Sequence, residues 1–258
     1  PQISPSVYSA CQDSGIAVVH TLHNYRYLCP GALLQRNNKP CELCIGRMPY
    51  FSIFFKCYRG SFSATSAVAS MIAYNRFKGT FEKMVNKYIV LTNFAKSRFV
   101  AGGFSAEKIE VKPNFLPNPP SVSTDRQRYA IFVGRLSQEK GVKTLLHAWR
   151  NIQGIHLKIA GEGPLRTELE MLSASLKLDV EFLGAVSSQR VLKLVGEAMF
   201  QIVPSEWYEG FPMVILEAYA CGTPVIASRI GSLEEVVLNE QTGFHFETGD
   251  SNDLARIV

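Results

Sequence analysis

The sequence contains no run of about 20 apolar residues, so no segment has the length that a membrane-spanning helix requires. Its first residues, PQISPSVYSA, lack the basic flank and apolar core of a signal peptide. It also has no internal repeat and no low-complexity tract. These absences argue against a protein with membrane-spanning helices, a secreted protein and a repeat protein, and they favour a globular, cytoplasmic one. A chain of 258 residues is long enough for two domains.

Acidic residues are scarce in the first half of the chain. Residues 1–128 hold 16 Lys and Arg against 6 Asp and Glu, whereas residues 129–258 hold 11 against 16. A basic half favours an anionic partner, such as a phosphorylated acceptor, an anionic membrane surface or nucleic acid. The alternative is a basic face that only contacts solvent.

Short apolar strands alternate with helices along the chain, most regularly in the second half. This alternation predicts an α/β fold with doubly wound parallel sheets. A first helix is expected over residues 4–15 and a strand at IAVVHTL, residues 16–22. The proline-rich segment NFLPNPPS reads as a linker. We therefore predict one domain over residues 1–118 and a second over residues 119–258.

The loop FVGRLSQEKG follows a predicted strand and suits an anionic ligand. Gly134 allows the backbone to approach a ligand closely, while Arg135 and Lys140 offer a forked donor and a point charge for phosphate. In doubly wound sheets such loops at the carboxyl ends of strands form the ligand site. The alternative is a pair of solvated surface cations.

The stretch YEGFPMVILE predicts an apolar helix that begins near Pro212 and carries one charge, Glu217. An unpaired buried carboxylate costs several kcal/mol, so its presence suggests a ligand. Because helical side chains lean toward the N-terminus, Glu217 is expected to accept hydrogen bonds from a nucleotide ribose. Glu209 precedes the helix and is placed to meet a transferred sugar. The alternative is a pair of structural carboxylates held by Arg or Lys.

The pair Glu209-x7-Glu217, together with GRLSQEKG and AGEGP, strongly resembles the retaining GT-B glycosyltransferases of family 4, also called glycosyltransferase group 1. The resemblance implies two Rossmann-like domains that face a cleft, an acceptor-side domain followed by a donor-binding one. It implies that Arg135 and Lys140 bind the donor diphosphate, that Glu217 binds ribose and that Glu209 contacts the donor sugar. Gly134, Gly161, Phe211 and Pro212 are then further substrate contacts.

The resemblance also implies a mechanism. Fixed cations stabilise the leaving diphosphate, no cofactor is required for catalysis, and the leaving phosphate takes the acceptor proton on the front face. His23, in VVHTLHNYRYLCP, is expected to face the cleft, although a His beside an apolar strand is often structural. The chain lacks the glycine-bearing opening of the family's first domain and stops at SNDLARIV. We therefore expect a fragment with an incomplete first domain and a truncated C-terminus.

Four cysteines, Cys29, Cys41, Cys44 and Cys57, follow the pattern C-x11-C-x2-C-x12-C. The C-x2-C spacing is that of a metal knuckle, so a structural zinc site is one interpretation and four ordinary thiols are the other. The segment MPYFSIFFKCYR mixes aromatic and basic residues. It is expected either to contact a membrane interface, peripheral to the inner membrane, or to pack over a neighbouring helix.

These observations favour transfer of a hexose from a nucleotide diphosphate sugar to a sugar or lipid-linked acceptor in polysaccharide or glycolipid synthesis. A GT-B phosphorylase or epimerase and a non-catalytic nucleotide-binding or scaffold subunit are alternatives. A zinc-bearing nucleic-acid module would explain the basic half, but it would not explain the helix that carries Glu217. We therefore expect no nucleic-acid partner.

Overall fold

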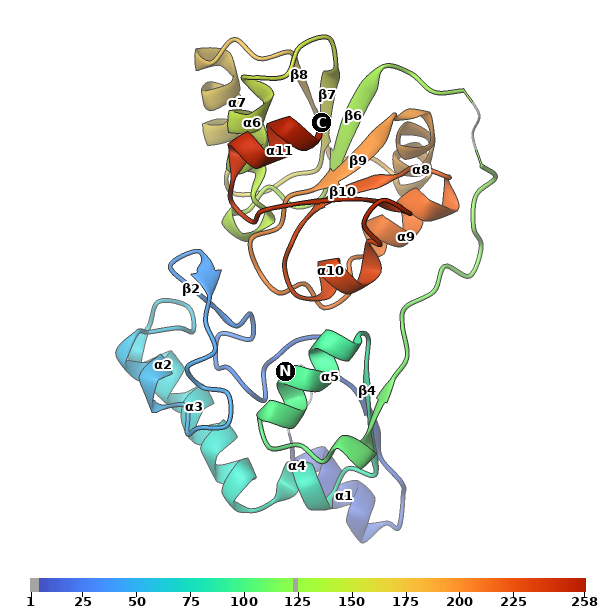
Figure 1. Cartoon of the computed structure of the whole chain (residues 1–258). Helices are drawn as coiled ribbons and strands as arrows, with labels where there is room; N and C mark the ends of the chain where they lie inside the picture. Colours follow the sequence, from blue (N-terminus) through green and yellow to red (C-terminus); the bar gives the residue numbers. More distant parts are fainter. Residues whose placement is uncertain (1–4, 123–124) are drawn as a thin grey trace. The chain divides into compact units, whose positions relative to one another are not determined.

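The computed structural model describes residues 5–122 and 125–258, so Ser4 of the predicted first helix lies outside the described residues. The chain divides into two compact units between Pro113 and Asn114 (Figure 1). The assignment of residues 1–118 to an acceptor-side domain and of residues 119–258 to a donor-binding domain stays a prediction.

The first unit is built on a three-stranded parallel sheet in the order β1-β4-β5. Its strands are β1 (Val19–Thr21), β4 (Lys87–Val90) and β5 (Ile109–Val111), and a hairpin adds β2 (Gln35–Arg36) and β3 (Lys39–Pro40). Its helices are α1 (Ser6–Asp13), α2 (Tyr50–Phe54), α3 (Phe62–Phe77), α4 (Thr80–Lys83) and α5 (Asn93–Ala101), with a 3-10 turn η1 (Ala106–Lys108). The first strand is shorter than predicted.

Local chemistry explains where the longer helices of this unit begin. The Ser61 hydroxyl accepts a hydrogen bond from the backbone N–H of Ala64 at the start of α3. The Thr92 hydroxyl does the same for Ala95 at the start of α5. Such caps satisfy backbone donors that the first helical turn leaves unpaired. Ser61 and Thr92 are therefore the capping residues of α3 and α5.

The second unit contains a six-stranded sheet in which all strand pairs are parallel, in the order β11-β10-β9-β6-β7-β8. The strands are β6 (Tyr129–Val133), β7 (His156–Ala160), β8 (Val180–Gly184), β9 (Phe200–Val203), β10 (Val225–Ser228) and β11 (Gly243–Phe246). This is the order of a doubly wound nucleotide-binding sheet, in which the winding direction reverses between the first and fourth strands, here β6 and β9. The predicted α/β class with parallel sheets is confirmed.

Helices cover both faces of this sheet. They are α6 (Val142–Trp149), α7 (Arg166–Ser175), α8 (Ser188–Glu197), α9 (Met213–Ala220), α10 (Ser232–Val236) and α11 (Ser251–Ile257), with a 3-10 turn η2 (Gln138–Lys140). Alternate residues of β6 show the two layers. Ala130 and Phe132 pack with α6, α7 and α11, whereas Tyr129 and Ile131 pack with α8, α9 and α10. Burial on both faces explains why the strands are continuously apolar.

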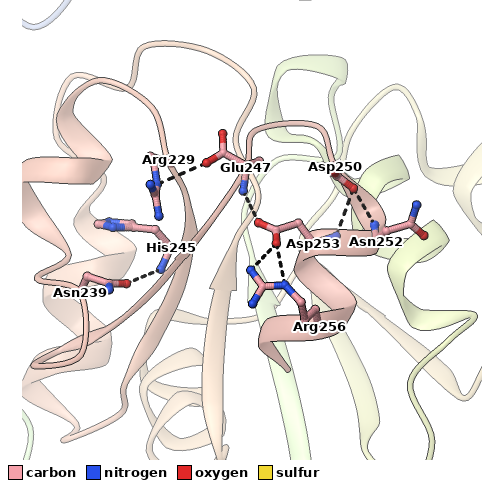
Figure 2. A network of polar contacts seen from close by, with 8 residues as sticks. All are labelled: Arg229, Asn239, His245, Glu247, Asp250, Asn252, Asp253 and Arg256. Carbon is pink, nitrogen blue, oxygen red and sulfur yellow. Dashed lines mark hydrogen bonds and ion pairs between the residues drawn. The ribbon is translucent and has the colours of Figure 1, made fainter.

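The end of the chain adds β11 and α11, which the sequence analysis did not predict as a complete strand and helix. Asp250 caps α11 by accepting hydrogen bonds from the backbone N–H groups of Asn252 and Asp253 (Figure 2). The Asp253 carboxylate accepts from the backbone N–H of Glu247 and pairs with Arg256. The Glu247 N–H, followed by the Arg256 side chain, lowers the pKa of Asp253. These contacts tie α11 to the strand that precedes it.

Within residues 5–122 and 125–258, the helices are all too short or too polar to span a bilayer.

Candidate active site

The predicted site residues of the second unit come together at the carboxyl ends of three adjacent strands. Gly134 follows β6, Gly161 follows β7, and the segment from Ser205 to Pro212 follows β9. Because the sheet is parallel, these loops share one edge, and the reversal between β6 and β9 separates the two loops that carry charge. In such sheets the ligand binds at the carboxyl ends of the strands where the winding reverses.

The two glycine loops touch through their backbones. The Gly134 N–H donates to the Ala160 carbonyl over 3.0 Å, and Gly161 has φ +146°. A Cβ on Gly161 would lie 1.9 Å from the Gly134 carbonyl oxygen. Only glycine fits at this approach, because any side chain would force the loops after β6 and β7 apart. The glycines therefore set the shape of this end of the sheet.

Lys140 and Glu209 form an ion pair across this edge, with 2.6 Å between Lys140 Nζ and Glu209 Oε1. Lys140 ends η2, and Glu209 lies on the loop between β9 and α9. The Ser205 hydroxyl donates to the same carboxylate oxygen over 2.7 Å. Glu209 is 5% exposed, so its charge is compensated by Lys140 and Ser205 away from bulk water. The ammonium group has three protons and can bind an anion while it holds Glu209.

Two further contacts hold the loop that carries Glu209. The Ser232 hydroxyl, at the start of α10, donates to the Glu209 carbonyl over 2.6 Å. Gly141 has φ +66°, and a Cβ there would lie 1.8 Å from the Pro204 carbonyl oxygen. The start of α6 therefore packs directly on the backbone that leaves β9. These contacts fix Glu209 from both sides of the loop.

Glu217 lies on α9 and is half-buried, with no side-chain ion pair or hydrogen bond to any residue that the structure describes. Burial raises its pKa above the ordinary value of 4.5. The predicted apolar helix is present and begins at Met213, after Pro212. Within this helix only Ile215 and Ala218 are fully buried.

The remaining predicted residues of this unit lie around the pair. Arg135 is exposed, and its guanidinium makes no ion pair within the described ranges. Phe211 is half-buried and Pro212 is buried, directly before α9. A free forked cation and a paired lysine on one loop suit a diphosphate, since both can donate to its oxygens.

Three residues that the sequence analysis did not single out belong to the site. Ser205 and Ser232 hold Glu209 through its side chain and its backbone, respectively. The Trp207 ring lies 5.7 Å from Lys140 Nζ, and its buried Nε1 has no hydrogen-bond partner in the described part of the chain. Such an orphaned donor is rare in native structures. Ser205 and Trp207 stand within four residues of Glu209, and that proximity was the one available signal.

His23 lies in the first unit and lines a cavity of about 570 Å³ beside the end of β1. His20 lies within β1 and lines the same cavity. Its Nδ1 is 2.5 Å from the Tyr8 hydroxyl, which also contacts the Tyr27 hydroxyl over 2.7 Å. Burial, followed by the nearby His23, lowers the pKa of His20. A neutral His20 and two phenols give this cavity hydrogen-bonding groups suited to a hydroxylated ligand.

The structure brings Cys29, Cys41, Cys44 and Cys57 to the lining of one small cavity, and all four are free thiols. Among the residues that the structure describes, however, no three His, Cys, Asp or Glu side chains are placed to hold a metal ion. Burial, followed by the neighbouring thiols, raises the pKa of Cys44 to about 11, and burial also raises that of Cys57. With no such group of ligands among the described residues, the predicted structural zinc site is not supported.

Comparison with known proteins identifies the family. The family described as Glycosyl transferases group 1 matches residues 118–258, more than half of the chain. The chain belongs to this family. Its fold also matches the crystal structure of Anabaena HepE in complex with UDP and glucose, with a TM-score of 0.70 and 23% identity over 97% of this chain and 63% of that one. At that identity the match shows the fold, an α/β fold with parallel sheets of the kind found in GT-B glycosyltransferases.

Two curated relatives illustrate the range of the match. An uncharacterized glycosyltransferase of Methanocaldococcus jannaschii is 40% identical over 124 residues, 46% of this chain and 32% of that protein. The phosphatidylinositol N-acetylglucosaminyltransferase gpi3 subunit of Schizosaccharomyces pombe is 26% identical over 93% of this chain and 52% of that protein. The chain thus spans about a third to about half of the length of these relatives.

Proposed function

We propose that the chain carries the donor-binding part of a retaining GT-B glycosyltransferase of family 4, which transfers a hexose from a nucleotide diphosphate sugar. One observation supports this most directly. The Lys140–Glu209 pair lies at the carboxyl ends of the strands where a doubly wound sheet reverses direction. A cation and a carboxylate fixed side by side suit a donor with a negative diphosphate joined to a hydroxyl-rich sugar.

Each charged residue then has a role set by its surroundings. Arg135 and Lys140 bind the diphosphate and stabilise the negative charge that develops as it leaves. Glu209, held by Ser205 and Lys140, accepts hydrogen bonds from the donor sugar close to its reacting carbon. Glu217 accepts hydrogen bonds from the ribose hydroxyls, which would stabilise its charged form and offset the desolvation that raises its pKa.

The backbone supplies further contacts. Gly134 and Gly161 line the nucleotide site, and their lack of side chains lets the donor approach the loops after β6 and β7. Phe211 and Pro212 contact the sugar or the phosphate at the start of α9. In the proposed front-face route, the leaving phosphate takes the proton of the acceptor hydroxyl, so Glu209 positions the sugar and does not form a covalent intermediate.

The acceptor is proposed to be a sugar or a lipid-linked molecule, in glycan or glycolipid synthesis. The cavity beside β1 supports a hydroxyl-bearing acceptor because His20, His23 and Tyr8 offer hydrogen-bonding groups there. The match with the fission-yeast phosphatidylinositol N-acetylglucosaminyltransferase subunit, over 93% of this chain, supports a lipid-linked acceptor.

Nucleotide binding tests the proposal first. Thermal unfolding is followed with UDP, GDP and ADP and with their sugars, because a ligand that binds only the folded state raises the unfolding temperature. One nucleotide class should stabilise the protein. Glu217→Gln should lower the affinity for that nucleotide by about tenfold, because it replaces a charge-assisted hydrogen bond with a neutral one. Glu168→Gln removes an exposed carboxylate of α7 and is the matched control, with unchanged affinity. Absence of stabilisation by any nucleotide would contradict the proposal.

Turnover tests the role of Glu209. Release of nucleoside diphosphate is measured with a panel of sugar and lipid-linked acceptors, for the wild-type chain and for Glu209→Ala. The variant should lose turnover far more than nucleotide affinity. The reverse result would assign Glu209 to nucleotide binding. Nucleotide binding without release for any acceptor would favour the alternative of a non-catalytic nucleotide-binding subunit.

A further inference from the structure

Helices α2 and α3 of the first unit pack against each other (Figure 1). Large apolar side chains are exposed on both helices and at Met48, just before α2. We call this group the aromatic face. Four of its members are more exposed than buried, at 66% for Tyr50, 79% for Phe54, 60% for Phe62 and 87% for Phe77. The others are Met48, Phe51 and Tyr74. Exposed apolar side chains that gather in one place mark interaction sites, whereas single ones are ordinary.

The spacing along α3 shows that its aromatic residues share one side. At about 100° of rotation per residue, Phe62, Tyr74 and Phe77 fall within an arc of about 120°. The side chains that α3 buries in the first unit, Thr65, Ala69, Ile72 and Asn75, fall within a separate arc of about 120° whose centre is about 140° away. Phe62 and Phe77 are therefore largely exposed and do not belong to the buried core of the unit, so their exposure needs another explanation.

The charge of the same segment is of one sign. Residues 43–81 contain no Asp or Glu and five basic residues, of which Arg47, Lys56, Arg59 and Lys78 are exposed. Lys78 Nζ lies 5.0 Å from the centre of the Tyr74 ring, and the Arg59 guanidinium lies 5.2 Å from that of Tyr58. Cations therefore stand beside the aromatic side chains. A surface of exposed aromatic rings flanked by cations is complementary to an anionic lipid bilayer, which has charged headgroups and an apolar interior.

We propose that the aromatic face docks on the surface of an anionic lipid bilayer, with Phe54, Phe62 and Phe77 inserted among the acyl chains and the neighbouring cations at the headgroups. A second copy of the chain is a poorer partner, because a symmetric contact would place the same basic residues against each other. This proposal does not rest on the proposed function, since vesicle binding requires neither a nucleotide nor turnover.

Vesicle sedimentation tests the proposal with the chain as it is. The probes are vesicles of phosphatidylcholine alone and of phosphatidylcholine mixed with phosphatidylglycerol, at low and at high salt. The protein should bind the mixed vesicles at low salt, bind neutral vesicles far less, and dissociate as salt rises. Two double variants separate the contributions. F54S/F77S removes exposed apolar area, and K56N/R59N removes charge with a residue type that tolerates their left-handed φ of 50° and 55°.

Each double variant should lower the affinity for mixed vesicles by about tenfold or more, with an unchanged unfolding temperature. The matched controls lie in the second unit. Phe244→Ser replaces an exposed aromatic residue of β11, and Lys177→Asn replaces an exposed lysine with φ 53°, so both should bind vesicles like the wild type.

Several outcomes would overturn the proposal. It would be contradicted if the protein did not bind mixed vesicles or bound neutral vesicles equally well. It would also be contradicted if the control variants lost as much vesicle affinity as the two double variants. Light scattering after size-exclusion chromatography provides one more check. If the protein forms dimers that F54S/F77S abolishes, and vesicles do not bind, the aromatic face contacts a second copy instead.

Discussion

Lys140 Nζ lies 2.6 Å from Glu209 Oε1, and this contact joins the loop after β6 to the loop after β9. The two residues are 69 positions apart in the chain. Their side chains are 24% and 7% exposed, so the lysine remains accessible while the carboxylate is buried. The pair therefore keeps a partly accessible cation at the carboxyl ends of the strands, where it can meet an anionic ligand.

Removal of the lysine alone should destabilise the protein. In Lys140→Ala the Glu209 carboxylate keeps only the Ser205 hydroxyl as a partner, and a buried charge that loses its counter-ion is costly. We expect the free energy of unfolding to fall by about 2 kcal/mol, a value reduced for the partial exposure of the lysine. Urea denaturation measures it.

The double variant K140A/E209Q provides the control. Glutamine has no charge to compensate, and its side-chain oxygen can still accept the hydrogen bond from Ser205. The double variant should therefore be more stable than Lys140→Ala. A double variant that loses as much stability as Lys140→Ala and Glu209→Gln together would show that the two side chains do not interact in solution.

Ser205 should act as a positioning residue for Glu209. Its hydroxyl, 1% exposed, donates to the carboxylate oxygen that Lys140 also binds. Ser205→Ala leaves the Glu209 carboxylate charged but no longer fixes its orientation. The value of kcat should therefore fall by about tenfold while KM for the donor changes little. Ser232→Ala, which removes a bond to the Glu209 backbone, is the comparison. A rise in KM alone would mean that Ser205 contributes to donor binding instead.

The predicted α/β class followed from patterns that are local in the sequence. Continuous apolar runs such as Tyr129–Val133 alternate with helical segments, and burial on both faces of a parallel sheet requires that pattern. The glycine-bearing loop after β6 was recognisable for the same reason, since Gly134 and Lys140 lie close together in the chain. Local signals thus led to the α/β class and to the part of the candidate site that lies on the loop after β6.

The rest depended on contacts between distant residues. Nothing in the sequence pairs Lys140 with Glu209, and Ser232 reaches Glu209 only because α10 begins beside the loop after β9. The cysteines show the converse case. Their spacing suggested a metal knuckle, and the fold brings them to one small cavity, but no three ligand-type side chains of the described residues are placed to hold a metal ion. Spacing along a chain does not specify the directions of side chains.

Glu217 makes stability depend on pH in a predictable direction. Its pKa in the folded state is raised above 4.5 by burial, so the folded protein binds more protons than the unfolded chain between the two pKa values. The contribution of Glu217 to stability is therefore complete below pH 4.5 and is lost as the pH rises through the folded-state pKa. Glu217→Gln should be more stable than the wild type at pH 7 and equally stable at pH 4.

Urea denaturation at both pH values measures this difference. The control is Glu168→Gln, whose carboxylate is exposed and pairs with Lys143 at the surface, so the substitution should change stability by less than about 1 kcal/mol at either pH. If Glu217→Gln were destabilising at pH 7, the carboxylate would have a stabilising partner in the folded protein. That result would weaken the assignment of Glu217 to a ligand.

Gly141 and Gly249 form a matched pair for testing the close approach of α6 to the loop after β9. Both have positive φ, +66° and +77°, so alanine carries a similar backbone strain at each. A Cβ at Gly141 would lie 1.8 Å from the Pro204 carbonyl oxygen, whereas at Gly249 it would meet nothing within 4 Å. We expect Gly249→Ala to lower the free energy of unfolding by about 1 kcal/mol and Gly141→Ala by about 3 kcal/mol or more.

Gly141→Ala should also affect nucleotide binding, whereas Gly249→Ala should affect stability alone. Because Gly141 follows Lys140 directly, displacement of this backbone should move the lysine away from Glu209 and weaken nucleotide binding, while Gly249→Ala should leave nucleotide affinity unchanged. Urea denaturation and nucleotide titration of both variants measure the two effects. Equal destabilisation by the two variants would show that the Pro204 backbone moves aside readily, and that the loop carrying Glu209 is not held by α6.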